Sequence, residues 1–115
     1  MSDSLGVLQG TLEMLALRTL AAAGSPMHGF EMLDWIRRTT GEVLVVEDGA
    51  LYPALRRMEK RGWLESAWGV SEKGRRARYY TLTPVGEKAL AREDERWRRY
   101  VQAVAKLEAG GPPAP

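Results

Sequence analysis

The sequence contains no cysteine, a single histidine and no apolar run of membrane-spanning length. Without cysteine there can be no disulfide, no thiolate metal site and no thiol redox sensor. With His28 as the only histidine, we expect no metal site and no cofactor. A membrane helix needs about 20 apolar residues, and the first residues lack the basic segment of a secretory signal. We therefore expect a cytoplasmic protein that makes no contact with a membrane.

Catalytic arrangements are also missing from the sequence. We find no Ser/His/Asp grouping, no Gly-rich phosphate loop and no pair of carboxylates in an apolar setting. The acidic run at residues 93–95 has basic neighbours and is typical of a solvated surface. We therefore expect no enzyme. The chain has 115 residues, of which 44% are hydrophobic and 28% charged, and this is typical of one globular domain with a modest core.

Charge is present, and it is unevenly distributed. Residues 49–80 carry 8 Lys and Arg against 3 Glu, a net charge of +5, whereas residues 1–48 carry 3 against 7, a net charge of −4. Residues 81–115 carry 6 against 5, so the whole chain has a net charge of only +2. A local basic block is what phosphate binding requires, although a solvated basic face gives the same pattern.

Two helices are predicted in the acidic first part of the chain. The first runs from near Gln9 to Ala23, with Thr11 as a candidate cap and Gly24 at its end. The second runs from about His28 to Thr40 and ends at Gly41. The apolar residues of both recur at helical spacing. In the first they are Leu8, Leu12, Leu15, Ala16, Leu20 and Ala23, and in the second Phe30, Leu33 and Ile36, widened by Met32 and Trp35.

The basic block begins with a third helix that has two unlike faces. An extended connector or small strand at residues 42–46 precedes it, and Asp48 is its expected cap. Leu51, Leu55 and Met58 lie within one narrow arc at 100° per residue, which predicts a core-facing side. Gly62 ends the helix. The opposite arc is polar and basic, with Tyr52, Pro53, Arg56, Arg57 and Lys60.

A β-hairpin is predicted directly after this helix. Two runs of aromatic and β-favouring residues, 63–68 and 77–82, flank a basic segment that contains Gly74. The connecting loop, about residues 69–76, is too long for a two-residue turn and should project as a wing. We expect Trp63, like Trp35 on the second helix, to lie in the core or at its edge, and Trp68 to brace the wing.

A polar-faced helix followed by a hairpin with a basic tip indicates a winged helix-turn-helix, mainly α with a small β-hairpin wing. In this fold the second helix of the pair enters the major groove of duplex DNA. Arg56 is our candidate for base reading, because a guanidinium can bind guanine bidentately. Arg57 and Lys60 suit phosphates. The predicted contacts from this helix are Gly49, Tyr52, Pro53, Arg56, Arg57 and Lys60.

Some of the side chains on and beside this helix have structural alternatives. The Tyr52 hydroxyl could pack on the wing instead, and Arg57 and Arg61 could form ion pairs with Glu59 or Glu65. The predicted wing contacts, to a minor groove or to flanking phosphates, are Lys73, Arg75, Arg76 and Arg78. A mobile basic loop with only non-specific attraction to DNA is the alternative for these four residues.

The last helix is predicted to start at Thr83 and Pro84 and to run to about Glu108, because Thr caps helices and Pro suits the first position. We therefore divide the chain into a DNA-binding domain (1–83), a dimerisation helix (84–108) and a disordered tail (109–115). Written as heptads, the helix has a seam that would pack against a second copy. The predicted interface residues are Leu90, Trp97, Tyr100, Val104 and Leu107, with Glu93 as the one misfit.

Trp97 and Tyr100 on this seam are also candidate ligand-binding residues. Paired indoles across a two-fold axis could stack on a planar molecule, so a small aromatic effector is a candidate partner. Ordinary dimer packing explains the same two residues equally well.

Several motifs together resemble the PadR family of bacterial winged-helix transcriptional regulators, over about residues 5–108. The matching segments are Gly-Thr-Leu-Glu at 10–13, His-Gly-Phe-Glu at 28–31, Gly-Ala-Leu-Tyr-Pro-Ala-Leu at 49–55, Arg-Gly-Trp-Leu at 61–64, and residues 74–86. The resemblance implies a homodimer joined through its terminal helices and repression relieved by a small molecule or stress signal. With one C-terminal helix, the chain resembles the short subfamily. Some short members bind flat aromatic drugs through a Trp of that helix, and Trp97 stands at the corresponding place.

We therefore expect a homodimeric, ligand-responsive repressor that binds an inverted-repeat operator in double-stranded DNA. One alternative is a winged-helix protein–protein interaction module, in which the basic face docks an acidic partner. Another is a small-molecule-binding protein without specific DNA binding.

Overall fold

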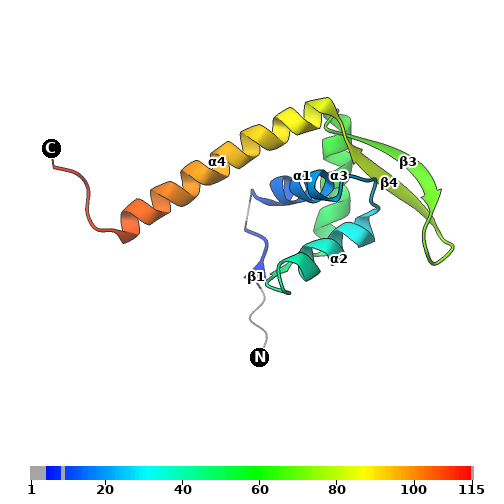
Figure 1. The fold of residues 1–115 in the computed structure, drawn as a ribbon, viewed down its shortest axis with the longest axis horizontal. Helices are drawn as coiled ribbons and strands as arrows, with labels where there is room; N and C mark the ends of the chain where they lie inside the picture. Colours follow the sequence, from blue (N-terminus) through cyan, green and yellow to red (C-terminus); the bar gives the residue numbers. More distant parts are fainter. Residues whose placement is uncertain (1–4, 9, 115) are drawn as a thin grey trace.

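Helices dominate the structure (Figure 1), and the residues that it describes also form two small sheets. A computed structural model describes residues 5–8 and 10–114. Its fold is a winged helix with a long C-terminal helix, as the sequence predicted. The elements in chain order are β1 (Leu5–Gly6), α1 (Leu12–Ala23), α2 (Gly29–Thr39), β2 (Leu44–Val45), α3 (Asp48–Lys60), β3 (Leu64–Val70), β4 (Arg76–Leu82) and α4 (Pro84–Glu108).

The core lies where α1, α2 and α3 meet. Its largest fully buried side chains are Leu17 of α1, Met32 of α2, and Leu51, Leu55 and Met58 of α3. The predicted apolar arc of α3 is therefore confirmed. Burying each such side chain contributes about 1.5–3 kcal/mol, so this contact fixes how α3 sits and which of its faces points outward.

The start of α1 differs from the expectation. The helix begins at Leu12, and Gln9, where we expected it to start, lies outside the described residues. Thr11 occupies the capping position, but its hydroxyl donates to the Leu8 carbonyl (2.6 Å) and accepts no helix N–H. The apolar pattern extended past the true start because Leu8 belongs to the preceding segment. Gly24 ends the helix with φ 64°, as predicted.

On α2 the expected apolar face was wrong at two positions. Ile36 and Met32 are buried, but Phe30 is 61% exposed and Trp35 is 38% exposed. At 100° per residue Phe30 lies about 160° from Met32, on the far side of the helix. The Lys73 ammonium of the β3–β4 loop lies 5.6 Å from the centre of the Phe30 ring. Phe30 is therefore a surface residue beside the wing.

A short parallel pair precedes α3. The segment at residues 42–46 is extended, as predicted, and Leu44–Val45 pairs with Leu5–Gly6. β1 itself was not predicted, because two residues carry no recognisable alternation. The Leu5 N–H donates to the Val43 carbonyl (2.6 Å). This pair ties the beginning of the described chain to the segment that leads into α3.

β3 and β4 form the predicted antiparallel hairpin, in register from Leu64↔Leu82 to Val70↔Arg76. The strands are longer than expected, so the loop covers residues 71–75 instead of 69–76. Pairing continues outward because Gly69 gives Tyr79 room: a Cβ there would lie 2.9 Å from the Tyr79 ring. Trp63 is partly buried against the core edge, as predicted. The hairpin extends from the helical cluster (Figure 1).

α4 has the bounds that the sequence predicted. The Thr83 hydroxyl accepts the Gly86 N–H (3.0 Å) at its start, and Pro84 follows the cap. Asp94 pairs with Arg18 of α1 (2.7 Å). From Arg98 onward every described residue is exposed, and the helix projects away from the rest of the chain (Figure 1). Among the described helices, none combines the length and apolarity needed to span a membrane.

Candidate nucleic-acid interface

α3 presents its polar side to solvent as a continuous basic surface. Tyr52, Pro53, Arg56, Arg57 and Lys60 are all exposed, because they lie opposite the fully buried Leu51, Leu55 and Met58. Within the described residues none of these three basic side chains forms an ion pair, so their charges are available to an anionic partner. This side of α3 therefore has the charge and accessibility that contact with a phosphate backbone requires.

The first turn of α3 differs in detail from the expectation. Glu47, not Asp48, is the capping residue, and Asp48 is the first helical residue. The Asp48 carboxylate still accepts a first-turn N–H, that of Gly49 (2.8 Å). Gly49 is exposed, and a Cβ added to it would meet no atom within 4 Å. Its backbone is therefore open to close approach from outside, as the predicted phosphate contact needs.

Tyr52 packs against α2 rather than standing free. A Cβ on Gly29 would overlap the Tyr52 ring, so the absence of a side chain at Gly29 lets this ring lie against the start of α2. The ring nevertheless remains 39% exposed. Tyr52 thus anchors α3 to α2 on the side of the basic surface, which differs from the alternative in which its hydroxyl packs on the wing.

His28 holds the beginning of α2 in place beside Tyr52. Its Nδ1 accepts the Glu31 N–H (3.2 Å), while the Glu31 carboxylate accepts the His28 N–H (3.1 Å). This reciprocal capping satisfies two backbone donors at the helix start. The His28 ring also meets Tyr79 of β4 edge to face, with 5.3 Å between ring centres. His28 therefore has a structural role as the capping residue of α2.

The hairpin places its basic residues on the same side as α3. Opposite residues in an antiparallel pair share a face, so Trp68 and Arg78 lie on one side, together with Arg76. The Trp68 ring is 56% exposed, and the Arg76 and Arg78 guanidinium carbons lie 4.3 and 5.4 Å from its centre. The predicted bracing of the wing by Trp68 therefore takes the form of cation–π contacts.

Arg78 and Arg61 are engaged by acidic residues, each in a different way. Arg78 lies 3.7 Å from the Glu59 carboxylate of α3. Arg61 pairs with Glu13 of α1 (2.7 Å), not with the Glu59 or Glu65 that we considered as partners. Lys73, Arg75 and Arg76 form no ion pair among the residues that the structure describes. The basic side chains nearest the hairpin loop are therefore without ion pairs among the described residues, whereas Arg78 and Arg61, farther from the loop, are paired with carboxylates.

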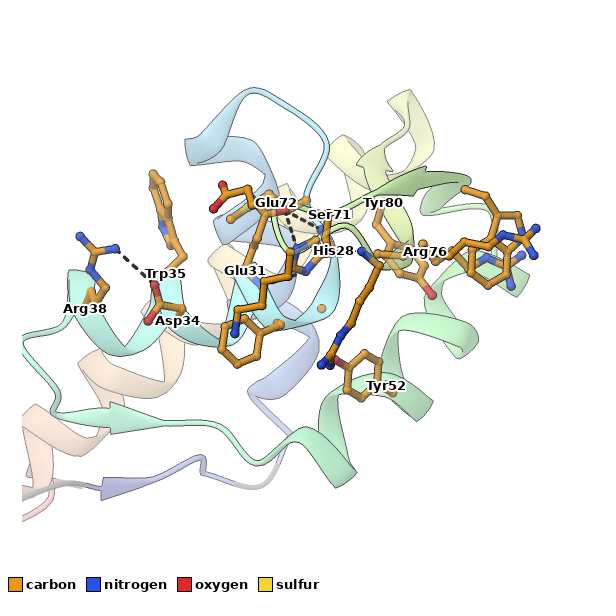
Figure 2. A pocket seen from close by; sticks show the side chains of 18 of the residues that line it. His28, Glu31, Asp34, Trp35, Arg38, Tyr52, Ser71, Glu72, Arg76 and Tyr80 are labelled. Carbon is orange, nitrogen blue, oxygen red and sulfur yellow. Dashed lines mark hydrogen bonds and ion pairs between the residues drawn. The ribbon is translucent and has the colours of Figure 1, made fainter.

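A groove of about 1020 Å³ lies between α2, α3 and the hairpin. Figure 2 shows Asp34, Trp35 and Arg38 at one end and Tyr80 and Arg76 at the other. Its lining includes six basic side chains and only three acidic ones. The basic residues are Arg38, Arg56, Lys73, Arg75, Arg76 and Arg78, and the acidic residues are Glu31, Asp34 and Glu72.

Two titrating groups of this groove are shifted by their surroundings. Hydrogen bonds from Arg37 and Arg38 hold the pKa of Asp34 below its ordinary value of 3.8. Asp34 is therefore ionised, and its ion pairs with Arg37 (3.0 Å) and Arg38 (3.3 Å) offset positive charge at this end of the groove. At the other end, burial raises the pKa of the Tyr80 phenol above 10, against a smaller opposing effect of Arg78.

A second hollow, of about 430 Å³, lies between α1 and α4. Trp97 and Tyr100 line it and stack on each other, with 6.0 Å between ring centres and 14° between planes. Met14 of α1 and Leu8 lie opposite. The structure thus brings together the two predicted ligand-binding residues on one wall of a hollow that Glu93 and Arg96 also line. Tyr100, Val104 and Leu107 are exposed, whereas Leu90 packs on the core of its own chain.

Comparison with known proteins agrees with this architecture. The model of the transcriptional regulator PadR-like family matches residues 17–92. The chain belongs to this family. Like its other members, this PadR-like protein is a transcriptional regulator with a DNA-binding winged-helix fold. The family resemblance that the sequence motifs indicated is therefore confirmed.

Solved structures of related regulators cover nearly the whole PadR-like chain. A transcriptional regulator from Clostridium thermocellum is 31% identical, with a TM-score of 0.75, over 85% of this chain and 93% of that chain. A PadR family regulator from Eggerthella lenta is 28% identical, also with a TM-score of 0.75, over 90% and 86%. A PadR-like regulator from Bacillus cereus is 26% identical, with a TM-score of 0.71, over 90% and 97%.

Sequence reasoning missed two features of this site. Phe30 was expected in the core, although its angle from Met32 would have revealed an exposed position. The contacts of Glu59 with Ser66 and Arg78 carried no local signal, because they join residues from three different elements. Both features lie where the hairpin meets the helices.

Proposed function

We propose that this PadR-like protein is a repressor that binds an inverted-repeat operator as a homodimer in the cytoplasm. The observation that carries the proposal is the groove that Arg56 of α3 shares with Lys73, Arg75 and Arg76 of the hairpin. None of these four side chains forms an ion pair within the described residues. Each copy would insert α3 into a major groove, and a two-fold dimer would place the two helices about 34 Å apart, one turn of the duplex.

The roles within each copy follow from position. Arg56, in the middle of the exposed side of α3, would read a base, since it has no competing partner among the described residues. Arg57 and Lys60 would contact phosphates, and Gly49, Tyr52 and Pro53 would approach the backbone. Lys73, Arg75 and Arg76 would reach the flanking phosphates or minor groove from the hairpin.

The second half of α4 supports the proposed dimer. Tyr100, Val104 and Leu107 expose apolar surface that nothing in the described chain covers, and a second copy could bury it along the seam that includes Trp97. We also propose the domain division that the sequence predicts: a DNA-binding domain at 1–83, a dimerisation helix at 84–108 and a disordered tail at 109–115. The Trp97–Tyr100 wall offers a stacking surface for a planar aromatic effector. Such an effector would induce transcription only by favouring one dimer geometry over another.

Binding to the DNA upstream of the protein's own gene tests the proposal. We would compare this duplex with a random duplex of equal length across a series of salt concentrations. A specific regulator should prefer its operator by about 10³ or more. Equal, weak and salt-sensitive binding to both duplexes would contradict specific recognition and favour the alternatives: a protein–protein module, or a small-molecule-binding protein.

A further inference from the structure

A chain of polar contacts links α3 to both strands of the hairpin. The Ser66 hydroxyl of β3 donates to the Glu59 carboxylate of α3 (2.6 Å). The same oxygen accepts from Nε of Arg78 on β4 (2.8 Å), and the Arg78 guanidinium lies 3.7 Å from Glu59. Arg78 thus contacts α3, the proposed recognition helix, through the Glu59 carboxylate, and β3 through the Ser66 hydroxyl.

Trp68 extends this network toward the hairpin loop. The guanidinium carbons of both Arg78 and Arg76 lie near its ring (5.4 and 4.3 Å from the ring centre). Arg78 is therefore held by three groups at once: Ser66, Glu59 and Trp68. The Arg78 Nε–H donates a hydrogen bond to Ser66, and the Arg78 guanidinium lies over the Trp68 indole. These contacts give the Arg78 side chain a fixed direction along the hairpin, pointing back to α3.

Arg75 provides the contrast within the same hairpin. Its side chain is exposed and forms no hydrogen bond or ion pair with any residue that the structure describes, whereas Arg78 would have to leave its partners to bind a phosphate. The Glu59 carboxylate lies 3.7 Å from the Arg78 guanidinium, so the positive charge of Arg78 is already matched by a negative charge on α3. The Glu59–Arg78 ion pair has no net charge, so it contributes little to the attraction of DNA phosphates. Its role therefore lies in the geometry of the hairpin.

We propose that Glu59, Ser66 and Arg78 are positioning residues that fix the angle of the hairpin relative to α3. The recognition helix and the wing then meet the DNA in a set register, and Arg78 acts through α3 instead of binding a phosphate. This inference rests on the proposed function for its DNA consequence, but the angle itself is a property of the free protein.

Wing mobility tests the inference without DNA. Because the chain has no cysteine, Glu72→Cys in the hairpin loop gives a single site for a nitroxide. In this background we would compare Ser66→Ala, which removes the central hydroxyl at constant charge, with Thr81→Ala, an exposed hydroxyl on the other face of the hairpin. A more mobile electron paramagnetic resonance spectrum is expected for Ser66→Ala only. Identical spectra for the two variants would overturn the proposal.

Arg78 variants separate positioning from phosphate binding. Lysine keeps the charge, but its single ammonium lacks the planar guanidinium that contacts Ser66, Glu59 and Trp68 at the same time. We expect Arg78→Lys and Arg78→Gln to mobilise the wing equally, and both to leave the salt slope of binding to random duplex unchanged. At Arg75, Gln should reduce that slope by about 0.9 and Lys should not. A slope that falls for Arg78→Gln and is restored by Arg78→Lys would assign Arg78 to a phosphate and overturn the proposal.

The last part of the test measures binding to the duplex from upstream of the protein's own gene, in the segment that the wild-type protein protects. Ser66→Ala should lower the preference for this duplex over random DNA about tenfold, because wing contacts with flanking base pairs lose register. An unchanged preference would overturn the proposal even if the wing were mobile. If wild type itself shows no preference, the proposed function fails, and the nitroxide spectra and the random-duplex salt slopes decide the inference by themselves.

Discussion

α3 and the C-terminal half of α4 are both helices with an apolar side, but only α3 covers that side within its own chain. Leu51, Leu55 and Met58 of α3 are fully buried, whereas Tyr100 and Leu107 of α4 are 62% and 80% exposed. A helix whose apolar side is buried has a fixed orientation, so its polar side can recognise a partner. A helix with uncovered apolar surface still needs a partner for its own burial.

The two halves of α4 show the same contrast within one helix. Its first turns are inserted into the domain, with Gly86 and Ala89 buried, whereas its end stands in solvent. Substitutions in the first half should therefore affect folding of the single chain, and those in the second half should affect assembly. Substitutions on α3 should affect DNA recognition or the domain core, depending on the face.

Gly86→Ala should have the largest effect, because it attacks the inserted end of α4. A Cβ at this position would overlap the backbone carbonyl of Trp63, which cannot move without disturbing β3. We expect a loss of about 3 kcal/mol in the free energy of unfolding and a fall in Tm of roughly 10 °C or more. Gly49→Ala is the control, since its Cβ would meet no atom within 4 Å. Equal melting temperatures for both variants at one protein concentration would contradict the packing described for α4.

Val104→Glu should break assembly while leaving the fold of each chain intact. A carboxylate in the proposed seam would be buried without a partner, and we expect dimer dissociation to increase roughly 100-fold or more. Sedimentation equilibrium measures this change, and circular dichroism checks that helix content is retained. Gln102→Glu introduces the same charge on the same helix away from the seam and should leave the dimer unchanged. Equal dissociation of both variants would show that the seam is not the interface.

Arg56→Ala should sharpen the contrast between the two sides of α3, since it leaves the buried side untouched. Loss of a bidentate contact with guanine should reduce discrimination between operator and random duplex by about 1–3 kcal/mol. Arg57→Ala, expected to remove a phosphate contact, should weaken both complexes to the same extent. Competitive binding to the two duplexes distinguishes these outcomes. An unchanged ratio for Arg56→Ala would show that the residue reads no base.

Tyr80→Phe should have the smallest effect, because it concerns one phenol and only alkaline conditions. Burial raises the Tyr80 pKa in the folded protein above its ordinary value of 10, so the unfolded chain loses this proton first. Stability from the buried neutral phenol is therefore present below pH 10 and lost as pH rises through the folded pKa. Urea unfolding from neutral to alkaline pH should show a shallower decline for Tyr80→Phe than for wild type. Parallel curves for Tyr80→Phe and wild type would contradict the expectation.

Much of the fold could be predicted because its signals are local. Thr83 and Pro84 mark the start of α4, and the spacing of Leu51, Leu55 and Met58 separates the two sides of α3. The errors arose where structure depends on distant partners. β1 is a strand because it pairs with Leu44–Val45. The Thr11 hydroxyl does not cap α1, because it donates a hydrogen bond to the Leu8 carbonyl instead.

The candidate site could be predicted as a set of residues but not as a set of contacts. Exposure of Arg56 and Lys60 follows from helical period alone. The engagement of Arg78 by Glu59 and Ser66 does not, because it requires the angle between α3 and the hairpin. Phe30 illustrates a different limit: an apolar residue at approximately helical spacing need not face the core, since surface aromatics are common.

Hydroxyl-radical footprinting of the wild-type protein on the DNA upstream of its own gene tests the central claim most directly. Two copies joined through α4 should protect two symmetric segments whose centres lie about 10 base pairs apart on one side of the duplex. Shorter protection from the two hairpins should flank them. A single protected segment, or uniform protection without a preferred position, would contradict a dimer that presents two α3 helices to an inverted repeat.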